Sequence, residues 1–303
     1  METLYIITGP TAVGKTSLSI QWAKANNAEI VSCDSLLFYR GMDIGTAKPR
    51  PEEREGIKHF GIDLVECDQP YNIGKYVIES KKWVDDIMSR GKNVLITGGS
   101  GFYLKSYVAP VVDEIHIPQN INTEVDQIYR KSGLEAVVDR LREVSPTDYD
   151  MIDLQNSRRV IPALKRCLAS GLSLSELRTR MTEGDQPFGE YKKKSLLLER
   201  SIDELTERIG IRTQQMLSEG LIEEVKILKE KGIERNPSAC GSIGYRETLS
   251  YLRGEIDRKT LEQDINQNTL KLVKKQLKWF RNQMEFEKVM SLDAGTLPMG
   301  DWF

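Results

Sequence analysis

Near its amino terminus the chain reads Gly9-Pro10-Thr11-Ala12-Val13-Gly14-Lys15-Thr16. This loop matches the pattern G-x-x-x-x-G-K-[ST], and it lies between the β-rich run Thr3–Thr8 and residues 17–25, where apolar residues recur at helical spacing. In such a loop the backbone N–H groups surround phosphate oxygens, and the start of the helix adds positive potential. Lys15 supplies a cation, and the Thr16 hydroxyl can hold Mg²⁺. The segment therefore predicts a site for a diphosphate or triphosphate.

Strand-like runs recur along the chain and alternate with helical patterns. Residues 29–32, 93–97 and 195–199 resemble buried strands, and residues 73–88 have helical spacing with Gly91 as a C-terminal cap. Strands that alternate with helices are typical of a parallel sheet. We therefore predict an α/β fold, a P-loop NTPase-like parallel sheet flanked by helices.

From about residue 113 the pattern changes to amphipathic helices. They cover residues 124–131, 134–144 and 158–170, and no strand-like run interrupts them. We therefore expect residues 113–189 to form an inserted all-helical domain. Residues 1–112 together with 190–303 are expected to form the catalytic core domain.

Composition narrows the class of protein. The 303 residues carry 43 Lys and Arg against 45 Asp and Glu, a net charge of −2, so a site for a polyanion must be a local patch. No apolar run approaches the roughly 18 to 20 residues that span a bilayer, and the first residues lack a secretory pattern, so we expect a cytoplasmic protein without membrane contact. The cysteines, Cys33, Cys67, Cys167 and Cys240, form no CxxC pair, which argues against structural zinc.

A candidate general base follows the second strand-like run. Nucleotide hydrolases and kinases usually carry a metal-holding carboxylate at the end of a later strand, but the run that ends at Thr97 continues into glycines. The acid that does follow a strand is Asp34, which we expect at the carboxyl edge of the strand neighbouring the first, beside the phosphate loop. A turn or helix cap is an equally good interpretation of its position before Ser35.

Ten segments together resemble the tRNA dimethylallyltransferase family, also called tRNA isopentenyltransferases or IPP transferases. They are GPTAVGKT (9–16), EIVSCDS (29–35), YRGMDIGTAKP (39–49), ITGGSGFY (96–103), SRRV (157–160), RIGIR (208–212), LIEEV (221–225), SIGYRE (242–247), QNT (267–269) and KQLKWFR (275–281). The phosphate loop alone is shared with many kinases, whereas GMDIGTAKP and IGYRE are specific to this family. The resemblance spans residues 4–281.

The resemblance implies a prenyl transfer. Dimethylallyl diphosphate would donate its five-carbon group to N6 of adenosine 37 in tRNA, forming isopentenyladenosine and releasing diphosphate. Residues 9–16 would then hold the donor diphosphate, with Mg²⁺ at Thr16. Asp34 is implied as the general base, and Lys15 and Arg212, with Arg208 as the second choice, would neutralise the leaving group.

The resemblance also implies positions that contact tRNA. They are Asp34, Ser35, Leu36, Leu37, Ser100, Arg158, Arg159, Val160, Ile161, Pro162, Gly241, Ser242, Ile243, Gly244, Tyr245 and Arg246. The inserted domain would grip the anticodon stem, and the protein is expected to be a monomer. Within residues 270–282, cations lie off an apolar stripe and could follow RNA phosphates, although a solvated helix face is the simpler interpretation.

Departures from the family pattern leave alternatives open. Leu37 and Pro162 replace a usual Gln and Arg, and residues 268–275 have lysines where arginines are usual, which loses forked hydrogen bonding. A paralogue that binds tRNA without modifying it is therefore one alternative. Another is an enzyme that prenylates free adenine nucleotides, but such an enzyme could dispense with much of the insertion. A small-molecule kinase is disfavoured by the missing second acid.

Overall fold

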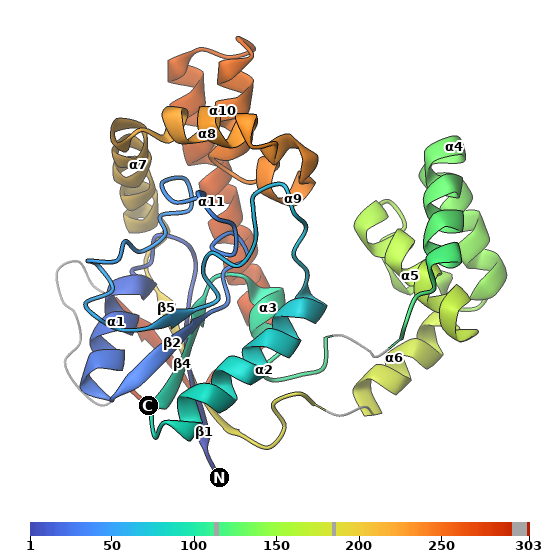
Figure 1. Ribbon diagram of the computed structural model, residues 1–303, viewed down its shortest axis with the longest axis horizontal. Helices are drawn as coiled ribbons and strands as arrows, with labels where there is room; N and C mark the ends of the chain where they lie inside the picture. The colour runs from blue at the N-terminus through green and yellow to red at the C-terminus, as the bar shows by residue number, and fades with distance from the viewer. Residues whose placement is uncertain (112–114, 184–185, 293–301) are drawn as a thin grey trace. The chain divides into compact units, whose positions relative to one another are not determined.

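The computed structural model describes residues 1–111, 115–183, 186–292 and 302–303, which belong to two units. The core unit comprises Met1–Val108 and Pro187–Phe303, and the inserted unit comprises Ala109–Gln186. The expected boundary at 112/113 lies outside the described residues. Figure 1 shows both units.

The core unit is built on a parallel six-stranded sheet with the order β3-β2-β4-β1-β5-β6. The strands are β1 Thr3–Thr8, β2 Ala28–Ser32, β3 His59–Phe60, β4 Asn93–Gly98, β5 Lys192–Glu199 and β6 Lys288–Ser291. This confirms the predicted fold class. The short edge strands β3 and β6 were not predicted, because two to four residues carry too little hydrophobic pattern.

Helices cover both faces of the sheet, giving three layers (Figure 1). The helices of the core unit are α1 Lys15–Ala25, α2 Ile73–Ser89, α3 Gly101–Lys105, α7 Ile202–Glu219, α8 Leu221–Glu230, α9 Pro237–Cys240, α10 Tyr245–Leu252 and α11 Arg258–Gln283, with a 3₁₀ turn η2 at Ile233–Arg235. Of these, α8, α9 and α10 lie beyond the sheet (Figure 1). None of the helices in the described ranges has the length and apolarity needed to cross a membrane.

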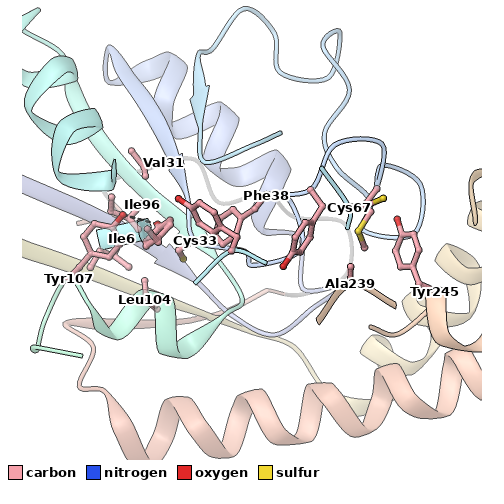
Figure 2. Packing of buried hydrophobic residues seen from close by; sticks show 14 of the residues in the cluster. Ile6, Val31, Cys33, Phe38, Cys67, Ile96, Leu104, Tyr107, Ala239 and Tyr245 are labelled. Atoms are coloured by element: carbon pink, nitrogen blue, oxygen red, sulfur yellow. Dashed lines mark hydrogen bonds between the residues drawn. The ribbon is translucent and has the colours of Figure 1, made fainter. Parts of the chain in front are cut away.

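Alternating strand residues divide the core between the two faces. Ile6 and Ile96 face α2 and α3, whereas Ile7 and Leu95 face α1 and the first half of α7. Figure 2 follows the first of these layers from Ile6 and Leu104 through Phe38 and Cys67 to Tyr245. The same apolar cluster therefore joins the sheet to the helices that follow β5, and it fixes the loops between them.

The described part of the inserted unit, residues 115–183, is helical and has its own apolar core. It contains α4 Gln119–Val144, η1 Tyr149–Met151, α5 Ser157–Ser170 and α6 Leu174–Glu183. Within α4 the backbone leaves helical geometry at Gly133, with φ 76°, between the two segments predicted separately. Val125, Leu141 and Leu164 are fully buried in this core.

A buried carboxylate ties the middle of the sheet to the end of α2. Glu29 on β2 is almost fully buried, and its oxygens accept hydrogen bonds of 2.6–2.7 Å from Arg90 and 2.8 Å from Lys92. The hydrogen bonds from Arg90, followed by those from Lys92, lower the pKa of Glu29 to about 2, although its burial acts in the opposite direction. The ionised form therefore stabilises the folded state.

We expect Glu29→Gln to reduce the free energy of unfolding at pH 7. The pKa shift corresponds to about 3 kcal/mol, which solvent around Arg90 and Lys92 reduces to on the order of 2 kcal/mol. Because the folded pKa is lowered, the difference from wild type is fully present above about pH 4.5 and shrinks as the pH falls towards 2. Urea denaturation between pH 7 and 3.5 measures it.

Glu55→Gln is the matched control, since Glu55 pairs with Lys24 on the exposed surface. We expect this variant to change the free energy of unfolding by less than about 0.5 kcal/mol. Equal losses for both variants would contradict the assignment to Glu29.

Candidate active site

The carboxyl ends of the central strands meet at one edge of the sheet. Thr8 on β1 pairs with Gly98 on β4 and Leu197 on β5, and Ser32 on β2 pairs with Thr97. The phosphate loop, Asp34, Ser100 and Arg200 directly follow these strands, so the register brings them to the same edge. The expectation that the strand before Asp34 neighbours the first strand was wrong, because β4 lies between β2 and β1.

The phosphate loop curls tightly between β1 and α1. Gly9 passes so close to β5 that a Cβ there would lie 2.6 Å from the carbonyl oxygen of Leu198. Ala12 has φ 65°, and Gly14, which precedes α1, has φ 107°. Positive φ values turn successive N–H groups towards one side, which is the arrangement that binds phosphate. The structure therefore supports the nest predicted from the sequence.

The backbone of the loop is held by side chains from the loop itself, from residues 200–208 and from α11. The Lys15 Nζ atom donates to the carbonyls of Gly9 and Pro10 at 3.0 and 2.9 Å. The Nε atom of Arg208 donates to Ala12 at 2.7 Å, and that of Arg200 donates to Val13 at 2.9 Å. The Thr11 N–H donates to Oε1 of Gln276 at 2.9 Å.

Two of these residues, Arg200 and Gln276, were missed as site residues. Arg200, which directly follows β5, also donates to Glu204 and to the carbonyl of Leu292 after β6, so it ties the loop to the ends of both strands. The sequence offers no pattern for Arg200. Gln276 lies within the KQLKWFR segment, which was noted without a role for this residue.

The predicted donor-site cations are close enough to interact. Burial lowers the pKa of the Lys15 amine to about 8, while the charge of Asp34 raises it and that of Arg212 lowers it. Burial also lowers the pKa of Arg212, with Asp34 opposing the shift and Arg208 adding to it. Arg212 further donates to the carbonyl of Thr46 at 3.1 Å. These mutual effects place Lys15, Arg208, Arg212 and Asp34 in one electrostatic cluster that favours an anion.

The segment after β2 folds back against the segment after β4. The Ser35 N–H donates to Oγ of Ser100 at 3.0 Å, and the two hydroxyl oxygens lie 3.2 Å apart. Asp34 accepts from the N–H of Leu36 through Oδ1 at 3.3 Å and from that of Leu37 through its carbonyl at 3.1 Å. Residues 34–37 and Ser100 are half-buried and lie together, so the turn interpretation and the base interpretation of Asp34 are compatible.

Glu224 on α8 binds residues of two other segments that carry the family resemblance, 39–49 and 242–247. Its carboxylate accepts from the N–H groups of Asp43, Ile44 and Gly45 at 2.7–3.2 Å and from the Tyr245 hydroxyl at 2.6 Å. A Cβ on Gly45 would lie 2.6 Å from the Tyr245 ring, so only glycine permits this approach. The contact fixes the turn that carries Thr46, and therefore the carbonyl to which Arg212 donates.

The predicted tRNA contacts fall in both units. Residues 241–244 connect α9 to α10, and Tyr245 and Arg246 begin α10. Tyr245 is fully buried, and the Gly244 N–H donates to Glu247. Residues 158–162 lie in the first turns of α5 in the inserted unit, where Arg158 and Arg159 are exposed and Ile161 is half-buried. Val160 is fully buried in the core of that unit, so its side chain contributes to packing.

The predicted basic face of α11 is exposed. The exposed cations are Lys271, Lys274, Lys275, Lys278 and Arg281. Three of them, Lys274, Lys278 and Arg281, line a hollow of about 390 Å³ together with Ile202, Leu277 and Asn282. The predicted apolar stripe faces inwards, with Val273 and Phe280 fully buried.

A metal ion would find few protein ligands. Across the residues that the structure describes, no three His, Cys, Asp or Glu side chains gather as a metal site. The Thr16 side chain at the start of α1 is exposed. Magnesium commonly binds through few protein oxygens and several phosphate oxygens. The donor set therefore fits a magnesium ion that binds together with a phosphorylated ligand.

Comparisons with known proteins show the family of the chain. A sequence model of the IPP transferase family matches residues 37–283. A tRNA dimethylallyltransferase of Opitutus terrae is 43% identical over 97% of this chain and 96% of its own. Solved structures include the tRNA isopentenylpyrophosphate transferase of Bacillus halodurans, 32% identical over 97% of this chain and 92% of its own, TM-score 0.69. A eukaryotic dimethylallyltransferase acting on tRNA is 25% identical over 92% of this chain and 70% of its own, TM-score 0.81. The chain belongs to the IPP transferase family.

Proposed function

We propose that this protein is a tRNA dimethylallyltransferase, which transfers the dimethylallyl group of dimethylallyl diphosphate to N6 of adenosine 37 and releases diphosphate. The observation that carries the proposal is the position of one carboxylate, Asp34, within electrostatic reach of Lys15 and Arg212 beside a phosphate loop. Family membership and the names of the full-length relatives support the same reaction.

In this reaction the C1–O bond of the donor breaks while a bond forms between C1 and N6. Negative charge builds on the leaving diphosphate, so fixed cations lower the barrier. Lys15 and Arg212 are the groups we assign to this role, with Arg208 beside them. Because burial desolvates both Lys15 and Arg212, their attraction for an arriving anion is weakly screened.

The N6 amine must lose a proton as it is alkylated. Asp34 is the general base that we assign, because a carboxylate within hydrogen-bond reach of N6 can accept this proton. Within the described part of the chain, the one hydrogen bond to its Oδ1 is a long one of 3.3 Å from the Leu36 N–H. The carboxylate therefore retains capacity to accept a further proton donor.

Mg²⁺ bound with the donor, with the Thr16 hydroxyl as its protein ligand, would neutralise part of the diphosphate charge. The chain's own cations, Lys15 and Arg212, act on the same anion from the loop and from α7.

The acceptor base is stacked in an anticodon loop and has to leave the stack to react. We assign its recognition to residues 34–37, Ser100 and 241–246 of the core unit. Residues 158–162 and the rest of the inserted unit would hold the anticodon stem. The exposed cations of α11 are suited to RNA phosphates, and such binding weakens as salt rises.

The reaction is tested by the nucleosides it produces. Incubation of unmodified tRNA with the protein, dimethylallyl diphosphate and Mg²⁺ is expected to yield N6-dimethylallyl adenosine, measured by mass spectrometry after digestion. Free AMP in place of tRNA is the control for the free-nucleotide alternative, and ATP alone is the control for a kinase. Tight tRNA binding without product, or product from AMP or ATP alone, would contradict the proposal.

We expect Asp34→Asn to lower the prenylation rate by about 10² to 10⁴, the usual contribution of a general base. The amide keeps the shape but cannot take the N6 proton, so tRNA affinity should stay within about twofold of wild type. Single-turnover rates and filter binding measure the two quantities. Asp203→Asn, an exposed change on α7, is the control, and a normal rate for Asp34→Asn removes the base assignment.

Lys15 predicts a pH dependence of donor binding. Since burial lowers the pKa of its amine to about 8, the amine loses its charge as the pH rises from 7 to 9. The affinity for inorganic pyrophosphate should fall by up to about tenfold per pH unit above 8. Lys15→Arg retains its charge, so calorimetry should find a flatter profile for this variant, whereas Lys24→Arg on the exposed face of α1 should behave as wild type. Identical profiles for wild type and Lys15→Arg would contradict the assignment.

A further inference from the structure

Gln276 on α11 joins the two halves of the site. Its Oε1 accepts from the N–H of Thr11 in the phosphate loop, and its Nε2 donates to the carbonyl of Gly99 after β4, both at 2.9 Å. We infer that Gln276 is a positioning residue, which sets the phosphate loop and the loop carrying Ser100 at the separation that the transfer requires. This inference rests on the proposed prenyl transfer.

The helix behind Gln276 is rigidly anchored against the same loop. Trp279, three residues later, packs so closely on Gly101 that a Cβ there would lie 2.3 Å from its ring, and Phe280 is fully buried. At Gly99 a Cβ would lie 2.8 Å from Nε2 of Gln276. The glycines at 99 and 101 thus leave room for α11. The packing of α11 fixes the backbone that carries the side-chain amide of Gln276.

Gln276 acts on the acceptor side through neighbouring bonds. Ser100 follows Gly99 directly and accepts the Ser35 N–H at 3.0 Å, and Asp34 precedes Ser35. A shift of the Gly99 carbonyl would therefore move Ser100 and, with it, the segment of Asp34. On the donor side Gln276 holds Thr11, between residues whose carbonyls are bound by Lys15 and Arg208.

The chemistry of this bridge requires an amide. One end must accept from an N–H and the other must donate to a carbonyl, which glutamine does without charge. An ionised glutamate cannot donate to Gly99, and it adds negative charge beside the diphosphate site. A protonated glutamate, however, has one O–H donor and one free oxygen, so it can make both bonds.

Two variants test the inference. Gln276→Met keeps the length and removes both bonds, and we expect the single-turnover prenylation rate to fall by about 10- to 100-fold, since small displacements of reacting groups have effects of this size. The affinity for tRNA should remain within twofold. Gln263→Met, at an exposed position of the same helix, should leave the rate unchanged.

Gln276→Glu tests the bridge through the pH dependence of pyrophosphate affinity. A purely structural role of Gln276 would not produce such a pH dependence. We expect its affinity for inorganic pyrophosphate to be at least tenfold below wild type at pH 8. The ratio to wild type should approach one as the pH falls below about 4.3, the ordinary pKa of a glutamate, and the side chain protonates. Gln263→Glu should show a constant ratio near one.

A Gln276→Met rate within twofold of wild type, or a Gln276→Glu ratio that does not change with pH, would overturn the inference. Failure of the proposed function is distinguishable. In that case the wild type forms no prenylated tRNA, while the pyrophosphate titrations still report whether Gln276 bridges the two loops.

Discussion

The structure depends on how the carbonyl groups of the phosphate loop are satisfied. The loop must turn its N–H groups towards a ligand, which directs carbonyls at residues 9–13 towards the protein, where unpaired polar groups are costly. Lys15, Arg208 and Arg200 donate to four of these carbonyls. The same cations supply the positive potential of the site, so loop geometry and anion attraction have one cause.

The turn at residues 43–46, to which Arg212 donates, is held by a carboxylate. Glu224 accepts hydrogen bonds from three consecutive N–H groups and from Tyr245, and this holds a turn that has no regular secondary structure. The carbonyl of Thr46 in that turn then accepts from Arg212. The segments GMDIGTAKP, LIEEV and IGYRE, which are distant in sequence, therefore form one support for Arg212, the arginine that we propose binds the donor.

The sequence predicted what local patterns determine. The central strands β1, β2, β4 and β5 and the phosphate loop follow from hydrophobic runs and glycine spacing, and their register alone brings Asp34 to the site edge. The strand order could not be predicted, because nothing in the pattern of β2 tells whether β1 or β4 lies beside it. Arg200 and Gln276 were missed for a similar reason: a residue that bonds a distant backbone group has no local signature.

The end of β4 favours the proposed role of this phosphate loop, which is to hold a diphosphate leaving group and not to hydrolyse ATP. Thr97 has a hydroxyl where those enzymes have a carboxylate, and this hydroxyl accepts a hydrogen bond from Ser19 at 3.0 Å. A side chain at Gly98 would lie 2.7 Å from Cys33, and one at Gly99 would lie 2.8 Å from Gln276. The end of β4 therefore has no carboxylate of the kind with which nucleotide hydrolases and kinases hold their metal, and positions 98 and 99 have little space for one. The acid of the site stands one strand further away, at Asp34, where in the proposed reaction it faces the acceptor amine and leaves the phosphate charge to Lys15, Arg208 and Arg212.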